Sequence, residues 1–209
     1  MVSFRWVVRL GVCGSRAVRD GFDLDAWRKA MRPNTKACFL ESPTNPTLEV
    51  LDIAEIAKIA HSVGAKLVVD NVFSTPLWQS PLQLGADCVV YSTTKHIDGQ
   101  GRCLGGVILG SEKFINDHIA GFIRQTGPSM SPFNAWVMLK GLETLAVRVR
   151  AQTDTAGKVA EALSKHPKVS KLIYPGRPDH PQAAVVKKQM RGGSTMAIHI
   201  TGRKRAASP

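Results

Sequence analysis

Short apolar runs separated by turn-rich or helical segments occupy the middle of the chain. Four of these runs predict strands, at residues 36–42, 66–71, 88–93 and 103–110. The second run, KLVVDN, is continuous enough in apolar character to be buried on both faces of a sheet. Strands that alternate with helices or crossovers predict an α/β fold with a largely parallel sheet.

The clearest predicted helix covers residues 52–63. Asp52 is a good N-cap with Glu55 at the capping-box position, and Gly64 can adopt the left-handed conformation that ends a helix. The apolar positions fall on one helical face, which comprises Ile53, Ile56, Ile59, Ala60 and Val63. This face is expected to pack on the sheet.

From residue 111 onward the pattern becomes mainly helical. Ser131 before Pro132 is a cap followed by a first-turn proline, which predicts a long helix through Arg150. A separate helix is expected at about 152–165, and residues 76–85 are expected to form a short connection. Two later segments, VSKLIYPG and STMAIHI, predict strands of a second, smaller unit.

The composition is that of a globular protein, with 209 residues, 44% hydrophobic and 21% charged. No run of about 18 uncharged apolar residues exists, which excludes a membrane-spanning helix and a membrane partner. The cysteines, Cys13, Cys38, Cys88 and Cys103, show neither C-x-x-C nor metal-ligand spacing. We therefore expect free thiols, no metal site and a cytoplasmic location.

A net charge of +12 raises the question of a nucleic-acid partner, but the charge lies at the ends of the chain. Residues 1–19 hold four arginines and no acid, and residues 201–209 hold three basic residues and no acid. Removing these seven charges leaves +5 for residues 20–200, which contain no nucleic-acid motif. A nucleic-acid binder is thus the last of the functional alternatives.

Side chains suited to chemistry follow three of the predicted strands. Asp70, the trio Ser92, Thr94 and Lys95, and Asn45 come at or just after strand ends, which meet at one edge of a parallel sheet. A lysine preceded by hydroxyls suggests a Schiff-base lysine beside a phosphate site, with a carboxylate available for a pyridine nitrogen. An ion pair between Asp70 and Lys95 that caps the sheet fits the same spacing.

Two segments carry a family resemblance. They are ESPTNPTLEVLDI and VVDNVFSTPLWQSPLQLGADCVVYSTTKHIDGQGRCLGG, the latter with the pattern D-x-x-x-x-S-x-T-K-x-x-x-G from Asp87 to Gly99. The chain resembles, from about Gly21 to Ile200, the pyridoxal-phosphate (PLP) enzymes of Cys/Met metabolism. Within that family KHIDGQGRCLGG is most similar to the O-succinylhomoserine sulfhydrylases, whereas cystathionine γ-synthases and γ-lyases more often carry an aromatic residue in place of His96.

The resemblance implies an aspartate-aminotransferase-like fold (fold type I), PLP as cofactor and a role for each candidate residue. Lys95 would form the Schiff base and Asp70 would pair with the pyridinium nitrogen. Ser92 and Thr94 would bind the phosphate, and Asn45 would approach the cofactor 3-oxygen and the substrate carboxylate. The implied reaction is replacement of the acyl group of an O-acylhomoserine by sulfide to give homocysteine, in methionine biosynthesis.

The resemblance also implies a domain division and a length. Residues 21–150 would be the C-terminal half of a large PLP-binding domain, and 151–200 the start of a small C-terminal domain, with atypical basic segments at 1–20 and 201–209. Family members are longer at both ends and carry further phosphate, ring-stacking and carboxylate-binding groups there. An inactive fragment is the alternative expectation, and the homotetramer of the family is expected for full-length relatives.

Overall fold

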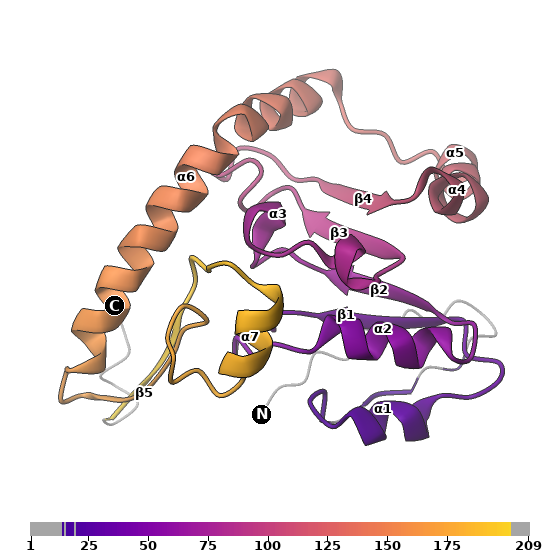
Figure 1. Cartoon of the computed structure of the whole chain (residues 1–209). Helices are drawn as coiled ribbons and strands as arrows, with labels where there is room; N and C mark the ends of the chain where they lie inside the picture. Colours follow the sequence, from indigo (N-terminus) through magenta and orange to yellow (C-terminus); the bar gives the residue numbers. More distant parts are fainter. Residues whose placement is uncertain (1–13, 15, 19, 202–209) are drawn as a thin grey trace.

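The computed structural model describes residues 14, 16–18 and 20–201 (Figure 1). Most residues of the basic segments expected at 1–20 and 201–209 therefore lie outside the described residues. Among the helices that are described, none has the length and apolar character that crossing a membrane requires.

A four-stranded sheet in the order β1-β2-β3-β4 forms the centre of the molecule. Its strands are β1 (Ala37–Glu41), β2 (Lys66–Asp70), β3 (Cys88–Ser92) and β4 (Gly106–Gly110). The first three are parallel and β4 is antiparallel to β3, so the predicted strands and the largely parallel sheet are confirmed. The ends of β1, β2 and β3 form one edge, hereafter the carboxyl edge, on the side of the sheet where α6 stands in Figure 1.

Helices surround this sheet. They are α1 (Leu24–Ala30), α2 (Ile53–His61), α3 (Thr75–Trp78), the 3-10 helix η1 (Pro81–Leu84), α4 (Glu112–Phe114), the π-helical η2 (Ile115–Ala120), α5 (Gly121–Thr126), α6 (Pro132–Ser164) and α7 (Ala183–Gln189). Helix α2 confirms its prediction, because the Asp52 carboxylate accepts a hydrogen bond from the amide of Glu55 at 3.1 Å. Its apolar face is buried against the sheet.

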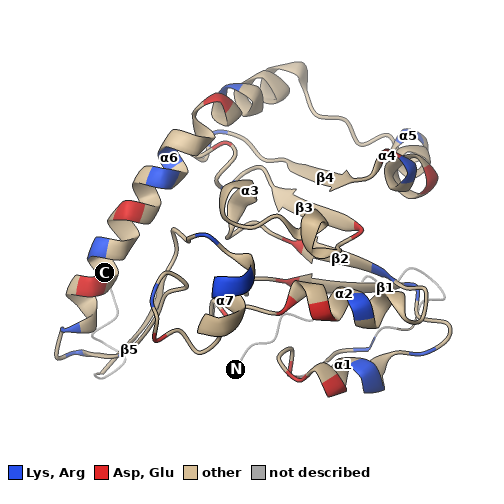
Figure 2. Ribbon diagram, viewed as in Figure 1, with Lys and Arg blue, Asp and Glu red and all other residues tan. Residues whose placement is uncertain are grey.

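Helix α6 is one continuous helix of 33 residues, so the expected break near residue 151 is wrong. No proline or glycine stands between Arg150 and Thr153 to end it. Its predicted start is confirmed, since the Ser131 hydroxyl accepts from the amide of Asn134 at 3.1 Å. Figure 2 shows that the first turns of α6 carry no charged residue, whereas the later turns alternate basic and acidic side chains.

A second, two-stranded antiparallel sheet follows α6, formed by β5 (Val169–Ile173) and β6 (Ala197–Ile200). Tyr174 joins it to α6 and to the loop before β6, because its hydroxyl donates to the carbonyl of Gly193 at 2.8 Å and its ring packs on Ala156 and Ala160. Helix α7 lies between the two strands in sequence and contacts the segment that leads into α2, because the side chain of buried Gln189 donates to the carbonyl of Leu51 at 2.8 Å.

Candidate active site

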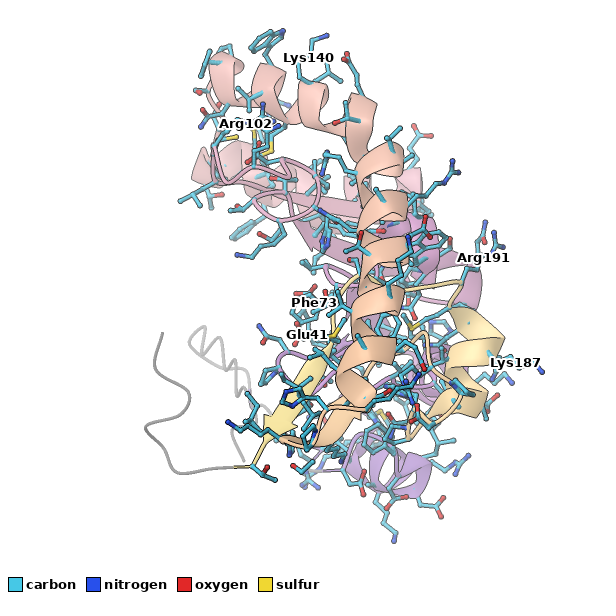
Figure 3. All side chains as sticks on the ribbon, turned by 90° about the vertical axis from the view of Figure 1, so that its left-hand side faces the viewer. Glu41, Phe73, Arg102, Lys140, Lys187 and Arg191 are labelled. Atoms are coloured by element: carbon cyan, nitrogen blue, oxygen red, sulfur yellow. The ribbon has the colours of Figure 1, made fainter. Side chains whose placement is uncertain are left out.

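The carboxyl edge brings two acidic side chains together. The parallel register pairs Glu41 at the end of β1 with Asp70 at the end of β2. The Asp70 carboxylate accepts a hydrogen bond from the amide of Val72 at 3.0 Å, which folds the chain over as it leaves the strand. In the view of Figure 3, Glu41 at the end of β1 and Phe73, three residues after β2, are drawn on one side of α6, and Lys187 and Arg191 are drawn on the other.

Both carboxyl groups are held away from their ordinary ionisation. Burial raises the pKa of Asp70, and the amide of Val72 offsets part of this effect. Burial also raises the pKa of Glu41, which the amide of Asn45 lowers and the negative charge of Asp70 raises further. Two such groups side by side favour a cationic partner. Among the residues that the structure describes, Asp70 forms no salt bridge, so the ion pair with Lys95 considered above is not formed.

Lys95 lies in the turn that follows β3. Its amide donates to the carbonyl of Ser92 at 3.3 Å, and its own carbonyl accepts from the amide of Gly99 at 2.7 Å. The Lys95 side chain is exposed, whereas those of Ser92 and Thr94 are half-buried. The Thr94 hydroxyl accepts from the amide of Gly105 at 3.1 Å, which ties the lysine turn to the segment that enters β4.

Asn45 lies in the loop that follows β1, with its side chain exposed. Its amide donates to the Glu41 carboxylate at 3.1 Å, so Glu41 connects Asn45 with Asp70. The same loop is held from outside the sheet, because Nε2 of buried His180 donates to the carbonyl of Leu48 at 3.0 Å. The structure thus groups Asn45 with Asp70, and Ser92 and Thr94 with Lys95, all after the ends of parallel strands.

Three buried polar atoms near this edge have no hydrogen-bond partner among the described residues. They are Ser74 Oγ, Thr93 Oγ1 and His96 Nδ1, which follow the ends of β2 and β3. Unsatisfied groups of this kind are uncommon in folded proteins and point to a further polar occupant. Together with an uncompensated carboxylate, an exposed amine and two hydroxyls, they fit a ligand that carries a protonated pyridine, an aldehyde and a phosphate. The residues present therefore fit PLP.

Asp87, the first residue of the D-x-x-x-x-S-x-T-K pattern, lies at the opposite end of β3. Its carboxylate accepts from Lys66 Nζ at 2.8 Å and from the amide of Leu67 at 2.9 Å, and it pairs with His61 Nε2 at 2.7 Å. Burial alone would raise the pKa of Asp87, but these three partners together hold it below its ordinary value. Asp87 thus anchors the starts of β2 and β3 and takes no part in the carboxyl edge.

Gly99, the last residue of the pattern, makes room for an arginine that the sequence does not mark. Arg148 on α6 donates to the carbonyls of His96 at 2.9 Å, Ile97 at 3.2 Å and Gly141 at 2.8 Å. Gly99 has a φ of +74°, and a Cβ there would collide with the Arg148 guanidinium. Arg148 therefore holds the lysine turn against α6, and no local signal could have identified it 53 positions from Lys95.

His96 joins the lysine turn to the second sheet. Its Nε2 lies 3.1 Å from the Ser194 hydroxyl, in the loop before β6. Burial and the nearby positive charge of Arg148 lower the pKa of His96, an effect that the backbone carbonyl of Val72 partly opposes. His96 is accordingly a neutral ring that packs behind Lys95 and contacts residues almost 100 positions away in sequence.

The sequence of the chain is similar to one protein family and to several known enzymes. A family model described as "Cys/Met metabolism PLP-dependent enzyme" matches residues 7–208. An O-succinylhomoserine sulfhydrylase from Mycobacterium tuberculosis is 52% identical over 177 residues, which are 85% of this chain and 44% of that protein. A cystathionine gamma-synthase from the same organism is 39% identical over 186 residues, or 88% of this chain and 48% of that protein.

The fold has a close counterpart among solved structures. The crystal structure of cystathionine gamma-lyase from Lactobacillus plantarum complexed with L-serine superposes with a TM-score of 0.84 at 36% identity. The match covers 87% of this chain and 48% of that one. The expected α/β fold of type I is confirmed over this region, and the chain spans about half the length of the relatives that it matches.

Proposed function

The chain belongs to the Cys/Met metabolism PLP-dependent enzymes, and from this premise we propose that it is an O-succinylhomoserine sulfhydrylase. In this reaction sulfide replaces the succinyl group on the γ-carbon of the homoserine ester, and the product is homocysteine. The observation that carries the proposal is the carboxyl edge, where Asp70 and Glu41 lie together with no cationic partner in the described part of the chain, while Lys95 and two hydroxyls lie at the end of the next strand.

The residues of this edge would hold the cofactor by complementary charge and by one covalent bond. Lys95 would bind the aldehyde carbon, Asp70 would face the pyridinium nitrogen, and Ser92 and Thr94 would donate to the phosphate. When bound, PLP supplies an electron sink for charge that develops beside the substrate amine. Asp70 would stabilise a proton on the ring nitrogen, because an adjacent cation offsets the cost of burying a carboxylate.

Two groups of this chain would act on the substrate. The Lys95 amine, once released from the cofactor, would remove the proton from the α-carbon and move protons at the β-carbon so that the γ-substituent can leave. Asn45 would orient the substrate carboxylate, since its loop is fixed on one side by Glu41 and on the other by His180. An exposed lysine side chain next to a fixed turn suits both duties of Lys95.

The choice of sulfhydrylase over related activities rests on sequence. The segment KHIDGQGRCLGG and the 52% identity to the mycobacterial sulfhydrylase favour sulfide as the nucleophile. A cystathionine γ-synthase or γ-lyase relative is the alternative, because the enzymes of those classes are 39% and 36% identical over similar lengths. An inactive chain is the second alternative; the matches cover 44% of the sulfhydrylase and 48% of the synthase.

The test is covalent trapping of the cofactor. The purified chain is mixed with PLP, reduced with borohydride and digested, and the labelled peptide is identified by mass spectrometry. We expect the label on Lys95 and its loss in Lys95→Ala, with Lys113→Ala as a matched control because Lys113 is an exposed lysine on α4 that pairs with Asp117 at 2.6 Å. Equal labelling of Lys95→Ala would refute the site. Homocysteine formed from O-succinylhomoserine with sulfide, and no cystathionine formed with cysteine, would separate sulfhydrylase from synthase.

A further inference from the structure

A buried chain of three side-chain amides lies behind the carboxyl edge. Asn71, Gln79 and Gln189 are 0%, 2% and 8% exposed, which is unusual for amides of this size. Gln79 Nε2 donates to Asn71 Oδ1 at 2.8 Å, and Gln189 Nε2 donates to Gln79 Oε1 at 3.0 Å. Burial of three linked amides, drawn from the end of β2, from α3 and from α7, requires complete hydrogen bonding.

The remaining polar atoms of these three side-chain amides all have backbone or hydroxyl partners. Asn71 Nδ2 lies 2.8 Å from the Tyr91 hydroxyl and 3.0 Å from the carbonyl of Gln79. Gln79 Nε2 also donates to the carbonyl of Ser42 at 2.8 Å. Gln189 Nε2 donates to the carbonyl of Leu51 at 2.8 Å, and its Oε1 accepts from the amide of Ile53 at 3.3 Å. Donors and acceptors alternate, so reversing any one amide would oppose two like groups.

The backbone groups held in this way belong to the segments that carry the candidate site residues. Asn71 follows Asp70 directly, and successive side chains of an extended segment point to opposite faces, so Asn71 fixes from behind the backbone that presents Asp70. Ser42 and Leu51 bracket the loop that contains Asn45, and the Ser42 hydroxyl accepts from the amide of Leu51 at 3.0 Å. Gln79, in the middle of the chain of amides, touches both segments.

We infer that Gln79 is a positioning residue for PLP. Gln79 fixes Asp70 relative to the Asn45 loop, because its side chain bonds to Asn71 on one side and to Ser42 on the other. Its third bond, from Gln189, makes both segments depend on the position of α7. The inference rests on the proposed function in that PLP is the ligand. Gln189 makes α7, a helix of the second unit, a structural part of the cofactor site. A helix shift that displaced Gln189 would leave Gln79 Oε1 without its donor and loosen both segments.

The first experiment needs no cofactor. Hydrogen exchange is followed in the PLP-free chain for wild type, Gln79→Met and the control Gln83→Met, a substitution of the same type at an exposed residue four positions away. We expect faster exchange in Gln79→Met over residues 41–51 and 70–73 and unchanged exchange in β5 and β6. The inference is overturned if exchange in Gln79→Met is faster throughout the chain, or if it equals the exchange in Gln83→Met at every segment. A network without a positioning role would give no local change in exchange.

The second experiment measures PLP binding by visible absorbance. Gln79→Met is expected to weaken PLP about tenfold and to displace the pH at which the bound cofactor changes absorbance, whereas Gln83→Met does neither. If wild type fails to bind PLP, the proposed function falls and the inference with it. If wild type binds and Gln79→Met binds equally well with the same pH midpoint, only the inference falls. Should Gln79→Met not fold, Gln189→Met, at the edge of the network, carries the same two measurements.

Discussion

The contact between Gly99 and Arg148 makes a quantitative prediction about the turn that holds Lys95. Gly99→Ala introduces a Cβ at a φ of +74°, which costs about 1–2 kcal/mol for any L-residue in the left-handed region. The same Cβ collides with the guanidinium, which then loses its bonds to the carbonyls of His96 and Ile97. Hydrogen bonds to a charged group contribute about 1.5 kcal/mol or more each. We expect a total loss of about 4 kcal/mol.

Two further variants separate these contributions. Gly64→Ala changes a glycine with a similar φ of +72° and nothing within 4 Å of the added Cβ, so it should lose only about 1–2 kcal/mol. Gly99→Ala in an Arg148→Met background should cost the same small amount, because the group that collides is gone. The free energies of unfolding come from urea titrations followed by circular dichroism.

The double-mutant cycle gives the decisive number. Gly99→Ala should be about 2–3 kcal/mol more costly with Arg148 present than with Met at that position. Equal costs in the two backgrounds would show that the arginine moves aside freely and that it does not hold the lysine turn. Unchanged stability in Arg148→Met would refute the reasoning in the same way.

Two predictions concern pH. Because burial raises the pKa of Asp70, its ionisation favours the unfolded chain, and stability is lost as the pH rises from about 4. Asp70→Asn should therefore stabilise the PLP-free protein at pH 7 while it weakens the binding of PLP. Equal urea midpoints of the variant and the wild type at pH 7 would contradict this. Burial lowers the pKa of His180, partly opposed by its bond to the carbonyl of Leu48 and by Asp179, so stability is lost as the pH falls below about 6.5. His180→Asn should flatten the urea midpoint against pH in that range, and a slope as steep as that of wild type would exclude His180 as its source.

The sequence predicts the elements whose stability is encoded locally. Helix α2 combines a cap, one apolar face and a terminal glycine, and the four strands are apolar runs bounded by turns. Helices α1 and α7 were not predicted, because each has only seven residues and is held by distant contacts, such as that of buried Gln189 with Leu51. The predicted separation of a helix through Arg150 from one at about 152–165 is wrong, because no proline or glycine between them interrupts the helix.

The candidate site divides along the same line. Asp70 ends one parallel strand and Lys95 follows the next, so the sheet alone brings these two strand ends to one edge. Arg148, Gln79 and Gln189 hold these strand ends in place. Arg148 and Gln189 do so through contacts with elements 50 or more positions away, and Gln79 does so as a buried amide with a backbone partner. Neither kind of contact has a spacing rule, since any element that crosses the edge can supply it.

The uninterrupted run of α6 has a mechanical consequence. Arg148 fixes the helix to the lysine turn, and Ser164 at its far end lies about 24 Å further along the axis, next to the second sheet. A rod of that length that pivots by about 5° at Arg148 moves its far end by about 2 Å and its fixed point hardly at all. Such a pivot would also displace Thr153, which accepts from Trp78 Nε1 at 2.9 Å, and the alanines on which Tyr174 packs, so α6 links the lysine turn mechanically to α3 and to the second sheet.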